Sequence, residues 1–209
     1  MDLTHPISSV VPSAHGAVLQ VLAHTTEPLS GRRVAELAAE RVSRRRVNDV
    51  LAELANAGVV LRERRPPAHL YRLNREHVAA PGVIALAGMW TELMVRIREE
   101  LASWDPPALA ACLFGSAARG DATTASDIDI LVVRGEVADD DPRWHQQIDR
   151  LIGRVHAWSG NGCEVLDLDV EGLAAAEARE DRLVLDLRRD AITLVGPDIR
   201  SLLPAKVAG

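Results

Sequence analysis

Two acidic residues, Asp127 and Asp129, stand one residue apart at the head of the apolar segment IDILVV, residues 128–133. Alternation along a strand would place both carboxylates on one face, where they repel each other unless a cation lies between them. Gly115 and Ser116 come earlier, and ten residues separate Ser116 from Asp127. Small residues after a strand let backbone N–H groups approach an anion, and the Ser hydroxyl adds a donor. The stretch therefore predicts a cation site beside an anion site.

The chemistry that suits such a pair of carboxylates is that of a magnesium centre. Mg²⁺ favours one or two carboxylates together with the phosphates of a substrate. Two such ions about 3.5–4 Å apart stabilise the attacking and leaving oxygens of an in-line displacement. We therefore predict an enzyme that uses two Mg²⁺ ions, or Mn²⁺ in their place, and ATP or another nucleoside triphosphate. The predicted reaction transfers the nucleotidyl group and releases pyrophosphate.

The motif GSAARGDATTASDID, residues 115–129, resembles the signature of the DNA polymerase beta superfamily of nucleotidyltransferases, and in particular the minimal nucleotidyltransferases. The resemblance implies a mixed sheet flanked by helices. Members of that group often act as antitoxins that adenylylate a HEPN-type toxin, so a cognate toxin protein is the implied acceptor. The implied nucleotide-binding residues are Gly115, Ser116, Arg119 and Ser126.

The superfamily uses a third acidic residue on a later strand, which binds metal and helps to deprotonate the acceptor. The candidate strand is GCEVLDLDV, residues 162–170. Asp167 fits the family order of apolar, acidic and apolar residues, so Asp127, Asp129 and Asp167 form the implied catalytic and metal-binding set. Asp169 is the alternative, or it caps the following helix. Solvation of the strand end is a further interpretation of both residues.

Other residues near the motif have simpler interpretations as well. Arg119 contacts triphosphate oxygens if it follows the family, or it pairs with Asp121. His145 and His156 fall on a predicted helix and are interpreted as surface or packing residues, because two-metal chemistry requires no histidine. Both cysteines lie in predicted apolar strands without the spacing of a zinc site, and they are expected to be buried thiols.

Charge is distributed unevenly along the 209 residues, whose net charge is −6. Residues 1–76 contain 11 Arg and 8 acidic residues, whereas the rest of the chain contains 13 basic and 22 acidic residues. The two parts are therefore expected to have different partners. The sequence starts without a basic, then apolar, leader, and it has no apolar run of the roughly 18 residues that a membrane span needs. We expect a soluble, cytoplasmic protein that does not contact a membrane.

The N-terminal part has the pattern of three helices and a hairpin. Helical periodicity begins after Ser13, Ser30 and Ser43, each of which is a suitable cap. After Gly58 the period changes to that of strands, with PPA, residues 66–68, as the turn. This order resembles a winged helix-turn-helix domain, and such regulators are often homodimers on paired DNA half-sites.

The third helix and the hairpin carry the groups that would contact DNA. Arginine can bond guanine, asparagine can bond adenine, and arginines on a wing can meet phosphates. The alternative is a solvated face on a protein-docking module. The predicted DNA-binding residues are Arg44, Arg45, Arg46, Asn48, Arg62, Arg64 and Arg65.

The predicted architecture is α/β, with a winged helix-turn-helix domain at residues 1–78 and a nucleotidyltransferase domain at residues 79–209. Within the second domain we expect one long linker helix over 84–104, after a break at Pro81 and Gly82, and a catalytic core over 108–198. The function that fits best is adenylyl transfer to a partner protein by an enzyme that also binds DNA and regulates its own transcription. The alternatives are a nucleotide-sensing regulator without catalysis and an enzyme that modifies a small molecule such as an aminoglycoside.

Overall fold

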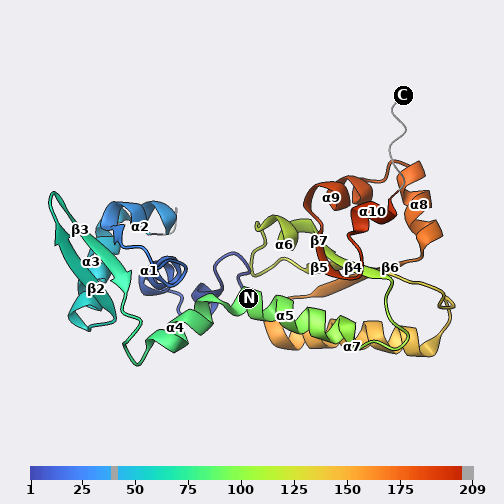
Figure 1. The fold of residues 1–209 in the computed structure, drawn as a ribbon, viewed down its shortest axis with the longest axis horizontal. Helices are drawn as coiled ribbons and strands as arrows, with labels where there is room; N and C mark the ends of the chain where they lie inside the picture. The colour runs from blue at the N-terminus through green and yellow to red at the C-terminus, as the bar shows by residue number, and fades with distance from the viewer. Residues whose placement is uncertain (39–41, 204–209) are drawn as a thin grey trace. The chain divides into compact units, whose positions relative to one another are not determined.

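The structure is a computed structural model that describes residues 1–38 and 42–203 (Figure 1). The chain divides into two compact units, of which one consists mainly of Thr4–Trp90 and the other consists of Met1, Leu3 and the chain from Thr91 onward. Among the described residues, no single helix is long and apolar enough to span a membrane. The consecutive helices α4 (Ala80–Ala87) and α5 (Met89–Ala102) pass that test only when they are taken together across the break between them.

The N-terminal unit packs helices against one face of a small antiparallel sheet with the strand order β1-β3-β2. Ser30 and Ser43 cap α2 and α3 as predicted, by accepting hydrogen bonds from Arg33 N and Arg46 N, whereas Ser13 precedes α1 without a side-chain bond. Apolar residues of α1, α3 and the hairpin form its core. Its elements are η1 (Pro6–Ser9), α1 (Ala14–Ala23), β1 (Leu29–Ser30), α2 (Gly31–Leu37), α3 (Arg44–Asn56), β2 (Val60–Arg65), β3 (Ala68–Leu73) and α4.

The C-terminal unit is the predicted mixed sheet flanked by helices. Its strand order is β6-β5-β4-β7, in which β5 and β6 are parallel and the other pairs are antiparallel. Helices α8, α9 and α10 cover one face of the sheet, and α5 and α7 lie on the other (Figure 1). The elements after α5 are β4 (Ala110–Phe114), α6 (Gly115–Arg119), β5 (Ile128–Val133), α7 (Pro142–Ser159), β6 (Cys163–Leu168), α8 (Val170–Ala178), α9 (Arg182–Asp190), β7 (Ile192–Val195) and α10 (Ile199–Leu202).

The segment between the units differs from its prediction. Instead of one helix over 84–104 there are two, α4 and α5, with Gly88 at the end of α4. Pro81 does not break the chain, because it lies in the first turn of α4, where a missing N–H costs nothing. Ala80 belongs to the core of the N-terminal unit, so the division falls at Trp90 and Thr91, later than the boundary predicted at residue 78.

Candidate active site

The site forms where β4 and β5 lie side by side. Strand β4 ends at Phe114, which pairs with Asp129 of β5, and the chain then turns into the short helix α6. Gly115 makes that turn with a positive φ of 70°. A Cβ atom at Gly115 would overlap the Asp129 carboxylate, so the turn requires glycine twice over, once for its backbone angle and once for space. The Gly-Ser segment is thereby placed directly against the acidic pair.

A second glycine leaves room for the other carboxylate. Gly162 begins the approach to β6, and its carbonyl accepts a hydrogen bond of 2.9 Å from Ile128 N. A Cβ atom there would overlap Asp127 Oδ1. Asp127 itself is exposed, and within the described residues its carboxylate has no hydrogen bond or ion pair. The side chains of both predicted acidic residues therefore pack against the backbone of a glycine.

The third acidic group beside this pair is Glu164, which the sequence reasoning missed. In the parallel ladder Glu164 is the register partner of Asp129, so the two side chains share a face of the sheet. Burial first, and then the charges of Glu164 and Asp127, raise the pKa of Asp129, while Arg119 acts in the opposite direction. The same three carboxylates, after burial, raise the pKa of the Cys163 thiol to about 12. These shifts mark an accumulation of negative charge that a cation would relieve.

Asp167, the predicted third member, lies on the other face of the sheet. Its register partner is Val132, an odd number of residues from Asp129 along β5, so it projects toward α7. Its Oδ2 accepts a hydrogen bond of 3.0 Å from the indole Nε1 of the fully buried Trp144. Its Oδ1 lies 3.0 Å from Nε of the buried Arg134 in an ion pair. The grouping of Asp167 with Asp127 and Asp129 is therefore corrected, and Asp167 ties β6 to the helix behind it.

Of the interpretations given to Asp169, the structure shows the helix cap. It is the N-cap of α8, and its Oδ1 accepts a hydrogen bond of 2.6 Å from Gly172 N.

Ser126, predicted to bind nucleotide, accepts a hydrogen bond of 2.9 Å from Thr123 N and so closes the loop before Asp127. Among residues 1–38 and 42–203, no three carboxylate, imidazole or thiol groups already stand close enough together to hold one metal ion.

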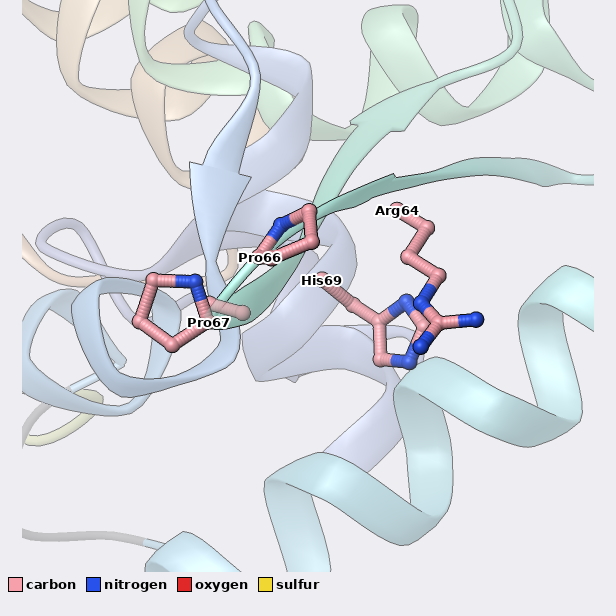
Figure 2. Close-up of a pocket in the computed structure, with 5 residues that line it drawn as sticks. Arg64, Pro66, Pro67 and His69 are labelled. Carbon is pink, nitrogen blue, oxygen red and sulfur yellow. The ribbon is translucent and has the colours of Figure 1, made fainter.

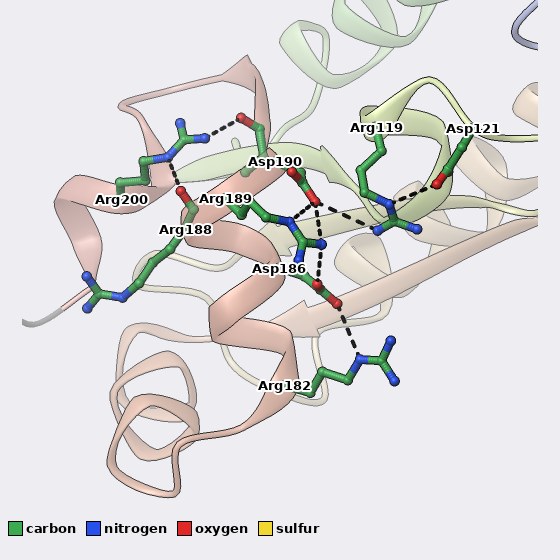
Figure 3. A network of polar contacts seen from close by, with 9 residues as sticks. Arg119, Asp121, Arg182, Asp186, Arg188, Arg189, Asp190 and Arg200 are labelled. Atoms are coloured by element: carbon green, nitrogen blue, oxygen red, sulfur yellow. Dashed lines mark hydrogen bonds and ion pairs between the residues drawn. The ribbon is translucent and has the colours of Figure 1, made fainter.

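Arg119 takes part in ion pairs at the end of α6. Its Nε lies 3.2 Å from Asp121 Oδ2, and its Nη1 lies 3.8 Å from Asp190 Oδ2. Figure 3 shows these contacts continuing along α9 through Arg189 to Asp186. The structure therefore shows the alternative interpretation, in which Arg119 pairs with Asp121. A triphosphate would have to compete with two carboxylates for this guanidinium.

The predicted DNA-binding side chains of the N-terminal unit are all exposed, but they differ in their contacts. Arg46 pairs with Glu53 at 3.0 Å, and Arg65 pairs with Glu63 at 2.8 Å. Asn48 lies with its Oδ1 against Gly31, where a Cβ atom would approach to 2.5 Å. Within the part of the chain that the structure describes, four make no ion pair: Arg44, Arg45, Arg62 and Arg64.

The register of the hairpin separates its arginines by face. Arg62 pairs with Tyr71 and Arg64 with His69, on the face whose buried residues pack with α3. Arg65 lies on the opposite face by alternation. Figure 2 shows Arg64 and His69 together beside Pro66, at a hollow of about 330 Å³. The hairpin therefore presents unpaired arginines on the same side as α3.

Part of the C-terminal unit matches a known protein family. Residues 94–187 match the family model described as "Nucleotidyltransferase domain", a span that includes Asp127, Asp129 and Glu164. None of the curated proteins compared with the chain matches it. A solved structure described as "Crystal structure of the toxin-antitoxin with AMP-PNP" is 20% identical to the chain, and the match covers 52% of this chain and 75% of that one with a TM-score of 0.33.

Proposed function

We propose that the chain catalyses a Mg²⁺-dependent nucleotidyl transfer from ATP to a partner protein, on the premise that residues 94–187 match a nucleotidyltransferase domain. The observation that carries the metal-dependent reaction is the placement of Asp127 and Asp129 against Gly162 and Gly115, with Glu164 on the same face as Asp129. Pyrophosphate leaves when the acceptor oxygen attacks the α-phosphorus.

The donor set fits magnesium by its chemistry. Its groups are carboxylate oxygens, the ligands that Mg²⁺ prefers, and the raised pKa of Asp129 has like-charge repulsion among its causes. Since the described carboxylates do not form a complete metal site by themselves, the remaining ligands would be phosphate oxygens of the substrate. When bound, the metal ions would neutralise charge that develops on the attacking and leaving oxygens.

Each residue of the site has a proposed role. Asp127 and Asp129 hold the metal, and the backbone at Gly115 and Ser116 approaches the triphosphate. Glu164 replaces Asp167 in the role of a third carboxylate that accepts the proton of the acceptor hydroxyl. It is suited to this because it is exposed and next to Asp129 in the sheet, where an incoming protein side chain can reach it.

The proposed acceptor is a cognate toxin, as the resemblance to antitoxin enzymes suggests. The test is to incubate the protein with MgCl₂ and ATP labelled in the α-phosphate, with and without the protein encoded beside it. We expect a labelled partner protein only in the complete mixture. Pyrophosphate release that leaves the partner protein unlabelled and that depends on an added small-molecule acceptor would contradict this choice of acceptor. It would leave the transfer reaction standing.

We further propose that the N-terminal unit is a winged helix-turn-helix domain that binds DNA upstream of its own gene. Four unpaired arginines on α3 and on the facing side of the hairpin support this proposal. Because arginine contacts with phosphate release counterions, binding should weaken steeply as salt rises.

Substitution of two unpaired arginines tests this surface. Arg45→Ala with Arg64→Ala should lower the slope of log affinity against log salt by about 1.8, since each lost phosphate contact removes about 0.9. The matched control is Arg46→Ala with Arg65→Ala, which removes the same charge from the same two elements but from residues already in ion pairs. Gel shifts across a salt series measure both. Equal slopes for the two double variants would show that the paired and the unpaired arginines contribute alike to DNA binding, which would contradict the surface proposed here.

A further inference from the structure

The turn between α7 and β6 contains a buried asparagine that the proposed chemistry does not use. Asn161 is 2% exposed, and every polar group that it has is engaged. Its backbone N donates to Ser159 Oγ at 3.1 Å, and its carbonyl oxygen lies 3.0 Å from His156 Nδ1. Its side-chain Oδ1 accepts from the α-amino group of Met1 at 2.6 Å. These contacts fix the turn independently of its contacts with the loop that precedes Asp127.

The side-chain nitrogen of Asn161 reaches the loop that leads into the site. Nδ2 donates to Ser126 O at 3.0 Å and lies 3.5 Å from Thr123 O. Ser126 is the residue immediately before Asp127. One residue after Asp127, Ile128 N donates to Gly162 O at 2.9 Å. The turn thus contacts the backbone on both sides of Asp127.

This arrangement matters because, within the described residues, the position of Asp127 depends on the backbone on either side of it. Its carboxylate has no hydrogen bond or ion pair there, and its Oδ1 lies against Gly162, the neighbour of Asn161. Without the amide of Asn161, the carbonyl oxygen of Ser126 would lose a buried donor. The loop would then be tied to the turn before β6 by fewer contacts, although the bond from Ile128 N to Gly162 O would remain. The position of Asp127 relative to Asp129 depends on that loop.

We propose that Asn161 is a positioning residue that fixes Asp127 for metal binding, an inference that rests on the proposed Mg²⁺-dependent function. It acts through the loop backbone and does not touch substrate. Groups that orient metal ligands from outside typically change metal affinity by about 10–100-fold when they are removed.

The test measures Mg²⁺ binding by the full chain without relying on turnover. Melting temperature is followed as MgCl₂ is added in the presence of a non-hydrolysable ATP analogue. For Asn161→Ala we expect half of the stabilisation to require about tenfold more MgCl₂ than the wild type. In a parallel assay, excess MgCl₂ should restore part of the lost kcat, which a purely structural defect would not allow.

Two further variants make the result decisive. Asn161→Asp keeps the oxygen that faces Met1 and removes the donor to Ser126, so it should reproduce the shift even if Asn161→Ala fails to fold. Asn74→Ala is the matched control, because Asn74 Nδ2 likewise donates to a loop carbonyl, that of Gly58 at 2.9 Å, but in the N-terminal unit. It should leave the MgCl₂ dependence unchanged.

The outcomes separate this inference from the function on which it rests. If the wild type shows no stabilisation by MgCl₂ and the analogue, the proposed function fails. If the wild type responds and a folded Asn161→Ala or Asn161→Asp variant responds at the same MgCl₂ concentration, only the role of Asn161 is overturned.

Discussion

Glu164→Gln is expected to lower the rate of nucleotidyl transfer by about 10²–10⁴-fold, the usual contribution of a general base. Glutamine keeps the size of the side chain but can neither carry the negative charge beside Asp129 nor accept a proton. Asp167→Asn is the matched variant, because it makes the same change on the same strand but on the opposite face. It should keep the rate within about tenfold of the wild type, since general-base catalysis does not pass through it.

The comparison requires that both variants be folded. Asp167→Asn weakens contacts with Trp144 and Arg134, so we expect it to lose about 1–3 kcal/mol of stability. Rates are therefore measured well below the melting temperature of each variant, from the release of pyrophosphate. A large loss in Asp167→Asn with little loss in Glu164→Gln would restore the assignment made from the sequence and contradict the one made from register.

Asp129→Asn is expected to abolish transfer and at the same time to stabilise the metal-free protein. The pKa of Asp129 is raised by burial and by its acidic neighbours. Ionisation of Asp129 therefore lowers the stability of the folded state. Asparagine has the same shape and no charge. We therefore expect the melting temperature in EDTA to rise.

The stability difference between Asp129→Asn and the wild type should depend on pH. Because the folded state holds the proton of Asp129 more tightly than the unfolded state does, the wild type gains stability as the pH falls through the raised pKa and loses it as the pH rises. The gain of Asp129→Asn over the wild type should therefore be largest near neutral pH and should shrink toward acid. Melting curves in EDTA over this range measure it. An Asp129→Asn variant less stable than the wild type at neutral pH would contradict the proposed repulsion.

The closeness of the Gly-Ser segment to the acidic pair could be predicted from the sequence because it is local. Gly115, Ser116, Asp127 and Asp129 lie within fifteen residues, and their spacing already implies adjacent strands. The mixed sheet with helices on both faces was confirmed for the same reason, since the periodicity of its strands and helices is evident along the chain.

The acidic residue that shares a face with Asp129 could not be found from local spacing, because it depends on the register between distant strands. The pattern of β6 offers acidic residues on both of its faces, and the spacing alone does not say which face matches Asp129. One signal was available. Glu164 shares its face with Leu166 and Leu168, just as Asp129 shares its face with Leu131 and Val133, and those leucines and the valine pack at one core. Matching the apolar partners would have selected Glu164.

Charge pairing is the other property that the sequence concealed. Arg46 and Arg65 look the same as Arg45 and Arg64 in a list of basic residues, yet each is in an ion pair with a glutamate. Arg46 reaches Glu53 two turns along α3, and Arg65 reaches Glu63 on the same face of β2. Such pairs form or fail according to rotamers, which spacing does not determine.

The most direct test of Mg²⁺-dependent nucleotidyl transfer is the release of pyrophosphate from ATP by the wild type and by Asp127→Ala with Asp129→Ala, assayed beside the candidate partner protein. We predict release that requires MgCl₂, stops in EDTA and falls to background in the double variant, which should keep its fold because both side chains lie against glycine backbone. Equal release by the wild type and the double variant, or release by the wild type that is unaffected by EDTA, would contradict the assignment of these two carboxylates as the metal-binding centre.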